Sequence, residues 1–471
     1  MKRLLFILGA WAVSAIASPS LLGRADKEQQ EEPAGSPGLM TVPDKFNTAL
    51  GVDWNRTYGQ TEPQQIHLSF GSDSKYARIQ FATLSPIDQA VLKYWPKSRH
   101  ASTSNKPVTQ LRGESWTFTD GGALQRELYM HMIKTKNLKA ATVYAYQVGA
   151  TTSNGTEWGP ELEFHTASKE DEFSFLSIGD MGVNNAVSMP HLVDFAKTHK
   201  YDFVTLSGDQ AYDMADFNGL KGDEYMNMVQ ELFARVPYMG VPGNHERAYN
   251  FSHYINRYAT LPHKESHFAN PLMYSFDYKS LHLISFSTEI YFYGTPEEVQ
   301  TAINWLEADL VEANKHRQQR PWVVLITHHP LYCSAANEDC TSKAQLIRDG
   351  FNNTGFGALE PLLLEYNVDV VIAGHVHNYE RTLPVAKGQV TSQSYHQPKS
   401  YMQVIVGNVG QPEGAESFNA TGPWADWSAK RYDGNGFSTV KVTSETFSMT
   451  HHQANQDGTL GSVIDSFTIS K

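Results

Sequence analysis

Five short apolar runs beyond residue 169 each end in a polar turn, and this arrangement limits the folds open to the chain. The runs are continuous rather than alternating, which is typical of strands buried on both faces. Segments with helical periodicity lie between them. Buried strands that alternate with helices predict an α/β layered domain, with β-sheets flanked by helices. The runs cover residues 173–178, 203–206, 238–241, 322–326 and 368–373.

Each run is followed at once by residue types that bind metals. Ligands of open α/β sheets bind beyond the carboxyl ends of the strands, so we expect these turns to meet in one place. Glycines such as Gly179, Gly208, Gly243 and Gly374 suit sharp exits and close backbone approach. Any one Gly-Asp turn, tyrosine or histidine is more often structural, but five such turns together indicate a metal centre. The residues are Asp180, Asp209, Tyr212, Asn244, His245, His328, His329, His375 and His377.

The elements around these turns can also be predicted. Thr295 and Glu298 form a capping box with Pro296 at the first helical position, and Val299, Ile303, Leu306 and Leu310 then share one helical face. Further helices are expected at 188–199, 223–235 and 357–366. Alternating runs at 401–406, 437–442 and 463–469 predict additional strands of the same domain, which we place at 169–471.

The preceding part of the chain has a different pattern. Ile66, Leu68 and Phe70 alternate with polar neighbours, and similar alternation recurs at 144–148 and 162–164. Short alternating runs separated by Gly, Ser and Asn predict a small antiparallel β-sandwich over 59–168. Residues 18–58 are rich in Glu, Gln, Gly, Ser and Pro and are expected to be a lead-in segment.

The first residues predict export. Lys2 and Arg3 precede an apolar run at 4–16, and Ala15 and Ala17 supply a small-x-small cleavage pattern, so residues 1–17 form an expected signal peptide. The run is too short to be a membrane anchor. In an oxidising compartment, Cys333 and Cys340 are expected to form a disulfide. Glycosylation sequons stand at Asn55, Asn154, Asn250, Asn352 and Asn419.

The net charge of the chain argues against some classes of binding partner. Fifty acidic against 38 basic residues give a net charge of −12, so a nucleic-acid or anionic-membrane binder working through bulk charge is not expected. No later segment is apolar enough for a membrane anchor. The expected product is therefore a secreted protein, with its location extracellular or in the lumen of the secretory pathway.

The five turns resemble the signature of the purple acid phosphatases, within the calcineurin-like metallophosphoesterases. The resemblance runs from Gly179-Asp180 through Gly374-His375-Val376-His377 and on to Asn378-Tyr379-Glu380-Arg381. It implies a metallophosphoesterase fold for 169–471. The sandwich at 59–168 is similar to the fibronectin type III-like domain that precedes the catalytic domain in the larger members.

The resemblance implies two metal ions about 3.5–4 Å apart. Asp180, Tyr212 and His377 would hold the first, and Asn244, His328 and His375 the second, with Asp209 shared between them. Carboxylates and a phenolate suit Fe(III), whereas an amide and two imidazoles suit a divalent ion. The second metal is left open between Zn, Fe and Mn.

The implied reaction is direct hydrolysis of small phosphate monoesters by a metal-bound hydroxide. Asn244 and His245 match positions that contact substrate, and His245 is a candidate proton donor. His329 is a second candidate for phosphate contact. The loop 332–340 lacks the histidine that plant members use as a proton donor, so Glu338, Asp339, His245 and water all remain open as the acid.

Two alternatives compete with an acid phosphatase. One is a metal-dependent phosphodiesterase or nucleotide pyrophosphatase of the same superfamily, which Tyr212 disfavours because this tyrosine distinguishes the purple enzymes. The other is an adhesion or scaffold protein with a dead metal domain. All seven ligand positions are filled, which argues against a dead site.

Overall fold

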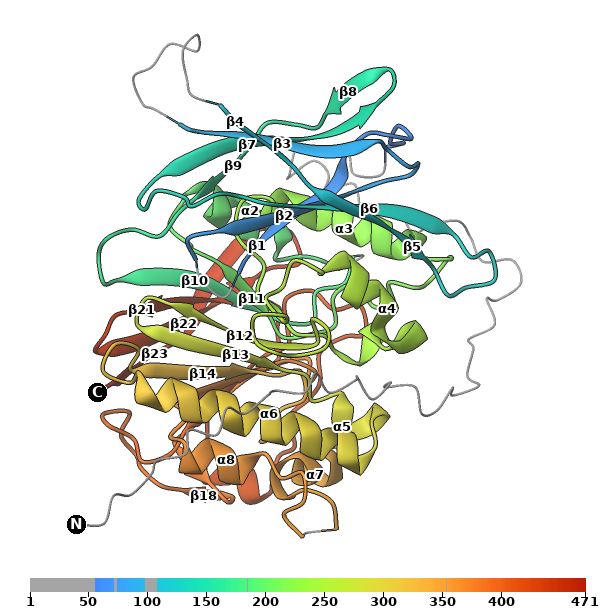
Figure 1. Ribbon diagram of the computed structural model, residues 1–471. Coiled ribbons are helices and arrows are strands. Elements are labelled where there is room, and N and C mark those ends of the chain that lie inside the picture. Colours follow the sequence, from blue (N-terminus) through green and yellow to red (C-terminus); the bar gives the residue numbers. More distant parts are fainter. Residues whose placement is uncertain (1–55, 72–73, 98–107, 184, 353) are drawn as a thin grey trace, which may run out of the picture.

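The structure is a computed structural model that describes residues 56–71, 74–97, 108–183, 185–352 and 354–471. The expected signal peptide, nearly all of the lead-in segment and Asn55 lie outside the described residues. The described elements form an all-β sandwich followed by a larger layered unit of sheets and helices (Figure 1). This agrees with the predicted fold class.

The N-terminal sandwich consists of two antiparallel sheets whose inner faces share one apolar core. One sheet has the order β1-β2-β6-β5, and the other has the order β4-β3-β7-β8 with β9 paired to β7. The strands are β1 (Gln64–Phe70), β2 (Ala77–Thr83), β3 (Gln89–Pro96), β4 (Thr109–Arg112), β5 (Glu114–Thr119), β6 (Glu127–Lys134), β7 (Val143–Thr152), β8 (Gly155–Trp158) and β9 (Leu162–His165).

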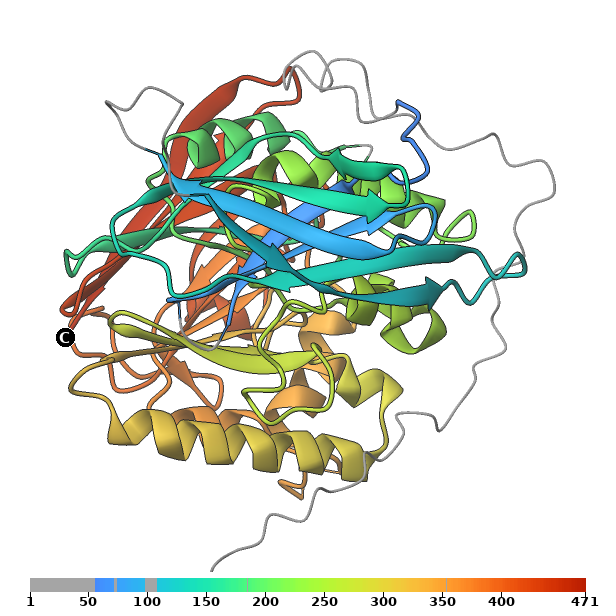
Figure 2. The same cartoon turned by 45° about the horizontal axis from the view of Figure 1, so that its top comes forward.

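One face of this sandwich lies on the rest of the molecule, which Figure 1 shows edge-on and Figure 2 shows with the sandwich turned toward the viewer. Polar and apolar residues alternate along β1, a pattern typical of a strand with one exposed face, yet every residue of β1 is buried. The reason is that α3 (Leu220–Phe233) and α4 (Ala248–Arg257) cover that face. The side chain of Gln65 accepts from Arg257, and its backbone N–H donates to Asn227 on α3. Polar alternation in β1 therefore marks a contact between the two units.

The second unit contains two large sheets, and the main apolar core includes side chains from both. The five-stranded sheet has the order β11-β10-β21-β22-β23 and the seven-stranded sheet the order β12-β13-β14-β15-β19-β16-β20. Their strands are β10 (Phe173–Ile178), β11 (Val204–Leu206), β12 (Met273–Tyr278), β13 (Leu281–Phe286), β14 (Trp322–Ile326), β15 (Val370–Ala373), β16 (Tyr379–Thr382), β19 (Met402–Val406), β20 (Ser428–Tyr432), β21 (Gly436–Val442), β22 (Thr446–Ala454) and β23 (Leu460–Ser470).

Helices cover the outer face of the seven-stranded sheet (Figure 1). The longest of the described helices is α6 (Pro296–Lys315), and it begins as predicted. The Thr295 hydroxyl accepts from the Glu298 backbone N–H, and the Glu298 carboxylate accepts from the Thr295 backbone N–H. The predicted apolar face of α6 is buried. The other elements are α2 (Met189–Lys197), α5 (Ile290–Tyr293), α7 (Ala344–Asp349), α8 (Glu360–Glu365), the short β17 (Val385–Ala386) and β18 (Gln389–Val390), and the single turns η1 (Asn244–Glu246), η2 (Asp339–Lys343) and η3 (Pro423–Ala425).

One detail differs from the expected arrangement. The run at 238–241 does not form a full strand; it pairs through single bridges from Tyr238 to Val204 and from Val241 to Ser207. The apolar runs divide between the two large sheets, since β10 and β11 lie in one sheet and β14 and β15 in the other. The turns still converge because both sheets present the carboxyl ends of their parallel strands to the same side.

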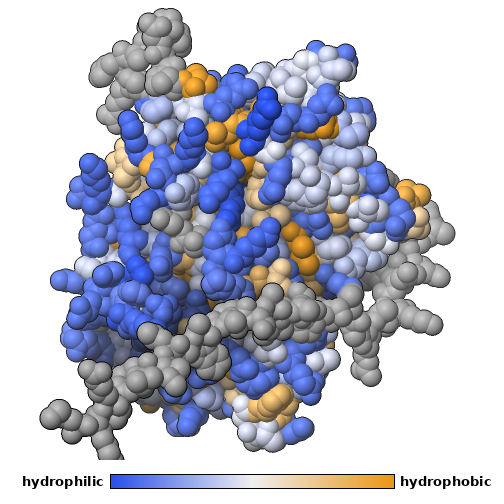
Figure 3. Space-filling view, in the orientation of Figure 1, coloured by the Kyte–Doolittle hydropathy of each residue, from blue (hydrophilic) through white to orange (hydrophobic). Residues whose placement is uncertain are grey.

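The outer surface is predominantly hydrophilic on the face that Figure 3 shows, with hydrophobic residues in small separate groups. No helix in the described ranges is long and apolar enough to cross a membrane.

Candidate metal centre

The five predicted turns meet between the two large sheets and bring all seven expected ligands into one cluster, in which Asn244 and His375 are partly buried and the other five are buried. Asp180 follows β10, Asp209 and Tyr212 follow β11, and Asn244 opens η1. His328 follows β14, while His375 and His377 follow β15. Side chains from positions 180 to 377 are thereby brought within contact of one another.

One half of the cluster is built from an amide and two imidazoles. The Asn244 Oδ1 lies 2.9 Å from His328 Nε2 and 3.1 Å from His375 Nδ1. The two ring nitrogens are 3.2 Å apart. Three potential ligand atoms thus point at one place, which is the geometry that a common cation would require.

The other half contains a phenol, an imidazole and a carboxylate. The Tyr212 Oη lies 2.8 Å from His377 Nε2 and 3.4 Å from Asp180 Oδ1. His377 Nε2 is 3.6 Å from the same carboxylate oxygen. Hard oxygen donors dominate this half, whereas nitrogen donors dominate the other.

Asp209 lies between the two halves. Its Oδ2 is 3.1 Å from His328 Nε2, and candidate ligand atoms of Asp180, Asp209 and His328 all fall within 4.8 Å of one another. The Asp209 Oδ1 accepts the backbone N–H of His245 at 3.0 Å, which holds the carboxylate in place. A carboxylate in this position can serve both halves at once.

Each of the three histidines has its second ring nitrogen on an acceptor. His328 Nδ1 lies 2.8 Å from the Ser207 carbonyl oxygen, and His377 Nδ1 lies 3.2 Å from that of Gly414. His375 Nε2 lies 3.0 Å from a carboxylate oxygen of Asp339. Because these oxygens only accept, the outer nitrogens carry the protons and the inner nitrogens are free to coordinate. Metal-binding histidines usually have such an outer acceptor, so the residues fit a metal pair.

The backbone at the site adopts conformations that most residues avoid. Asp180, Asp209, Tyr212 and His375 all have positive φ, between 51° and 68°. Such conformations in residues other than glycine cost energy and gather at functional sites. The neighbouring glycines are required by space: a Cβ on Gly243 would lie 2.2 Å from Asp209 Oδ1. The backbone at Gly243 therefore approaches the side chain of Asp209 as closely as was expected.

Electrostatics in the cluster favour a bound cation. Burial raises the pKa of Asp180 well above its ordinary value. Burial also raises the pKa of the Asp209 carboxyl, but His328 and His245 outweigh it and hold that pKa below the usual range. The pKa of Tyr212 is raised well above its usual value, mainly by burial and then by Asp180 and Asp209. A phenolate at this place requires a strong cation beside it.

His245 lies at the edge of the cluster with both ring nitrogens near carboxylates. Its ring packs on that of Tyr212 with centroids 4.5 Å apart. Nδ1 lies 3.2 Å from Asp213, and Nε2 lies 3.5 Å from Glu413. Burial lowers the pKa of His245, but Asp209, Asp213 and Glu413 outweigh it and raise that pKa to about 10.

His329 is more deeply placed. Only 3% of the residue is exposed, its Nε2 lies 3.3 Å from Glu289, and its ring packs against Phe292 and His375. Burial, and then His328, lower its pKa well below the ordinary value. The structure thus groups His329 with His375 in the wall of the site, whereas His245 stands nearer its rim.

Several residues around the ligands were not identified from the sequence. Asp213, Glu289 and Glu413 come from three different turns and have no pattern of their own. Glu246 is buried and accepts the backbone N–H groups of Asp209, Gln210 and Gly243, so it ties two of the ligand turns together. Its position two residues after Asn244 is the one signal that was available.

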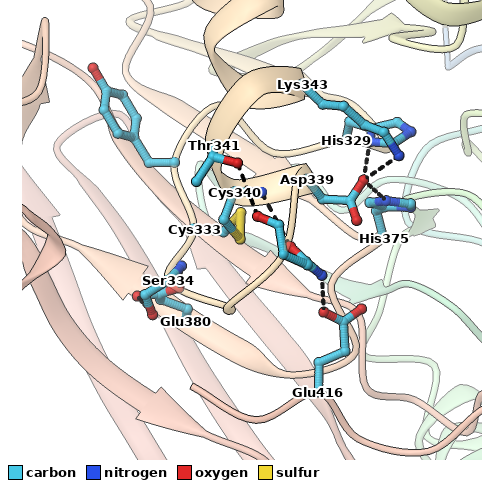
Figure 4. Close-up of a disulfide and its surroundings, with 12 residues drawn as sticks. His329, Cys333, Ser334, Asp339, Cys340, Thr341, Lys343, His375, Glu380 and Glu416 are labelled. Atoms are coloured by element: carbon cyan, nitrogen blue, oxygen red, sulfur yellow. Dashed lines mark hydrogen bonds and ion pairs between the residues drawn. A yellow bond between two sulfur atoms is a disulfide. The ribbon is translucent and has the colours of Figure 1, made fainter. Parts of the chain in front are cut away.

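The loop that contains Glu338 and Asp339, two of the candidate general acids, is closed by the Cys333–Cys340 disulfide, which is formed as expected. Asp339 points toward His329, Lys343 and His375 (Figure 4). Glu338 points elsewhere, with 69% of its side chain exposed and its carboxylate 3.2 Å from Lys343 Nζ. Of the two acids, only Asp339 contacts the cluster.

The chain matches three sequence families in succession. Residues 63–166 match the family described as purple acid phosphatase, N-terminal domain, and residues 173–379 match calcineurin-like phosphoesterase. Residues 400–466 match iron/zinc purple acid phosphatase-like protein C. The second match contains all seven cluster residues.

Relatives and solved structures agree with these matches. Acid phosphatase type 7 of Mus musculus is 32% identical over 436 residues, covering 88% of this chain and 92% of the mouse protein. The phosphoenolpyruvate phosphatase of Allium cepa is 29% identical, covering 85% and 80%. The structure of purple acid phosphatase PPD1 from yellow lupin superposes with a TM-score of 0.67 at 21% identity, covering 87% of this chain and 74% of the lupin chain. This chain belongs to the purple acid phosphatase family of metallophosphoesterases.

Proposed function

We propose that the protein is a secreted acid phosphatase that hydrolyses small phosphate monoesters at a pair of metal ions. The observation that carries this proposal is the convergence of seven side chains into two adjoining donor groups with Asp209 between them. A relative named acid phosphatase type 7 and another named phosphoenolpyruvate phosphatase support phosphatase activity, and the chain has the fold of a purple acid phosphatase.

The types of ligand in the two halves favour a different metal in each. Asp180, Tyr212 and His377 would hold Fe(III), because carboxylate and phenolate oxygens are hard anionic ligands. Asn244, His328 and His375 would hold a divalent ion, which is Zn, Fe or Mn. Asp209 would serve both. When bound, the two ions would supply an activated water as the nucleophile and neutralise charge on the phosphoryl group.

Side chains at the rim would then bind and orient the substrate. The Asn244 amide keeps its nitrogen as a donor while Oδ1 faces the histidines, so Nδ2 can bind a phosphoryl oxygen. His245 is oriented by Asp213 and Glu413 and is the candidate donor to phosphate and to the leaving group. His329 would act on the site by packing behind His375 rather than by reaching the phosphate.

Replacing Asp209 by Asn tests the proposed site. Hydrolysis of p-nitrophenyl phosphate should fall by about 10³-fold or more, because the shared carboxylate is lost. Asp194→Asn, on the exposed face of α2, should leave the rate unchanged. Full activity in Asp209→Asn would overturn the metal-centre proposal.

A substrate comparison separates the phosphatase from the competing phosphodiesterase. The wild-type protein should hydrolyse p-nitrophenyl phosphate faster than bis-p-nitrophenyl phosphate by at least tenfold in kcat/KM. The reverse preference would favour the diesterase. Binding of both without hydrolysis would support a scaffold protein.

Export of the protein is also proposed, with cleavage after Ala17. The disulfide and the exposed sequons at Asn154, Asn250 and Asn352 are compatible with the secretory pathway, and Asn419 is partly exposed. Expression in a eukaryotic secretory host should yield a product in the medium that begins after residue 17 and loses mass on deglycosylation. Retention of residues 1–17 in the medium would contradict the signal prediction.

A further inference from the structure

The disulfide-closed loop 333–340, called the bridged loop below, packs directly on a ligand turn. Cys333 is buried in a small apolar cluster with Ala335, Val376 and Ile405. Val376 is the residue between His375 and His377. The disulfide joins this buried cysteine to Cys340, so the far end of the loop is held beside the same turn.

Hydrogen bonds hold the bridged loop from its other side. The Asn337 amide accepts the Cys340 backbone N–H and donates to Glu416 at 2.7 Å. Ser334 donates both its backbone N–H and its hydroxyl to the buried Glu380. The loop therefore has a defined geometry at both ends, and Asp339 immediately precedes its second cysteine.

Three side chains lie close to the Asp339 carboxylate (Figure 4). Its Oδ1 lies 3.0 Å from His375 Nε2 and 2.9 Å from Lys343 Nζ, with His329 Nδ1 at 4.0 Å. Lys343 lies on the same single turn, η2, at four residues' separation. Only 15% of the Asp339 side chain is exposed, so solvent offers little alternative to these contacts.

We propose that Asp339 is a positioning residue for the metal centre, which orients His375 through Nε2, and that the Cys333–Cys340 disulfide holds Asp339 in that place. This inference rests on the proposed metal-dependent function. The carboxylate keeps the His375 proton on Nε2 and leaves the Nδ1 lone pair facing Asn244 and His328. Without this acceptor the ring can turn or take the other tautomer, and Nδ1 is lost as a donor.

His375 differs from the other two histidines in the kind of outer acceptor. His328 and His377 each face a backbone carbonyl, which side-chain substitution leaves in place. His375 alone of the three depends on a side chain, and that side chain lies outside every ligand turn. Outer partners of metal-binding histidines typically contribute 10- to 100-fold in affinity. A single substitution at Asp339 can therefore isolate this contribution.

Metal affinity provides the decisive measurement. The protein is freed of metal with a chelator and titrated with Zn²⁺ against a chromophoric chelator. Asp339→Ala should weaken the Zn²⁺ site by about 10- to 100-fold, and Asp339→Asn, which keeps an acceptor oxygen without the charge, by less. Glu338→Ala is the matched control, because it removes the neighbouring carboxylate and the second partner of Lys343; its affinity should stay within about twofold of wild type.

A purely structural effect is distinguishable in the same samples. The metal-free proteins should melt within a degree or two of one another, since the proposed role concerns His375 and not the core. If Asp339→Ala fails to fold, Asp339→Asn decides by the same titration. Unchanged Zn²⁺ affinity in a folded Asp339 variant overturns the inference. Absence of Zn²⁺ binding by wild-type protein would instead overturn the proposed metal centre itself.

The disulfide half of the inference has its own test. A Cys333→Ser/Cys340→Ser double variant should lose Zn²⁺ affinity by a similar factor, because Asp339 is no longer held against His375. Adding Asp339→Ala to that variant should cause little further loss, since both changes remove the same interaction. If the two changes together weaken Zn²⁺ binding by the product of their separate factors, the disulfide does not act through Asp339.

Discussion

The Tyr212 hydroxyl and the His377 Nε2 are 2.8 Å apart, although 165 positions separate the two residues in the chain. Tyr212 follows β11 in the five-stranded sheet, and His377 follows β15 in the seven-stranded sheet. The contact therefore joins the two sheets across the site. Asp180 lies on the same side, 3.4 Å from the phenol, so the three side chains form one donor group.

The first prediction concerns colour. A tyrosinate bound to Fe(III) absorbs visible light, so iron-loaded protein should show a broad visible band that Tyr212→Phe reduces by at least tenfold per bound iron. Tyr291→Phe removes another buried hydroxyl, which donates to the Gly357 carbonyl and not to any of the seven ligands, and should leave the band intact. Visible spectra with metal analysis check this, and an iron-loaded Tyr212→Phe protein of undiminished colour would refute the assignment.

The second prediction concerns the carboxylates beside His245. His245→Gln should lower kcat for p-nitrophenyl phosphate by about 10²-fold, because a proton donor is lost. Asp213→Asn should lower it by less, about tenfold, since Glu413 still orients the ring. Asp216→Asn, whose partner is Lys221, is the control. Steady-state kinetics provide the measurement. If the kcat of Asp213→Asn equals that of wild type, the His245 ring is not oriented by the Asp213 carboxylate.

The third prediction uses the space at Gly243. An added Cβ would lie 2.2 Å from the Asp209 carboxylate and 2.7 Å from the His328 ring. Gly243→Ala should therefore displace the shared carboxylate and reduce bound metal to less than half of the wild-type content. Gly59→Ala, where the nearest atom would be 3.4 Å away, should keep full metal content. Metal analysis after dialysis is the check, and equal metal content in both variants would show that the site tolerates the displacement.

The fourth prediction concerns stability against pH, away from the metal centre. His282 lies between Asp277 and Asp309, each 2.8 Å from one ring nitrogen. Burial lowers the His282 pKa, but the two carboxylates outweigh it and raise that pKa to about 9. The folded-state pKa exceeds the unfolded one, so this stabilisation is full below about pH 6.5 and declines as pH rises through 9.

Substitution of His282 should remove that decline. The free energy of unfolding of His282→Gln should fall relative to wild type by up to about 3 kcal/mol at pH 6, with the difference shrinking by pH 10. His316→Gln, in an exposed pair with Glu312, should change little at either pH. Denaturant unfolding at the two pH values measures the difference in unfolding free energy between wild type and His282→Gln. A difference that is larger at pH 10 than at pH 6 would contradict the prediction.

Much of the fold was predictable from local patterns. The capping box at Thr295 and the apolar face of α6 were predicted and are present, because both depend on residues within a few turns of one another. The helices α4, α5 and α7 and the strands β12, β13 and β22 were not predicted. The run at 238–241 lacks a full ladder for a tertiary reason. Met239 and Val241 donate their backbone N–H groups to carbonyls of β11, but the Tyr238 N–H donates to Leu68 of β1 instead.

The residue types of the site could be read from the chain alone, since Asp, Asn, Tyr and His at strand exits carry their chemistry wherever the backbone places them. What the chain alone could not supply was the set of partners around them. Glu413 reaches His245 from a turn 168 positions away, and Asp339 reaches His375 from a disulfide-closed loop that packs on Val376. Such contacts leave no periodic trace in the sequence, because they arise from the packing of two sheets and their loops in three dimensions.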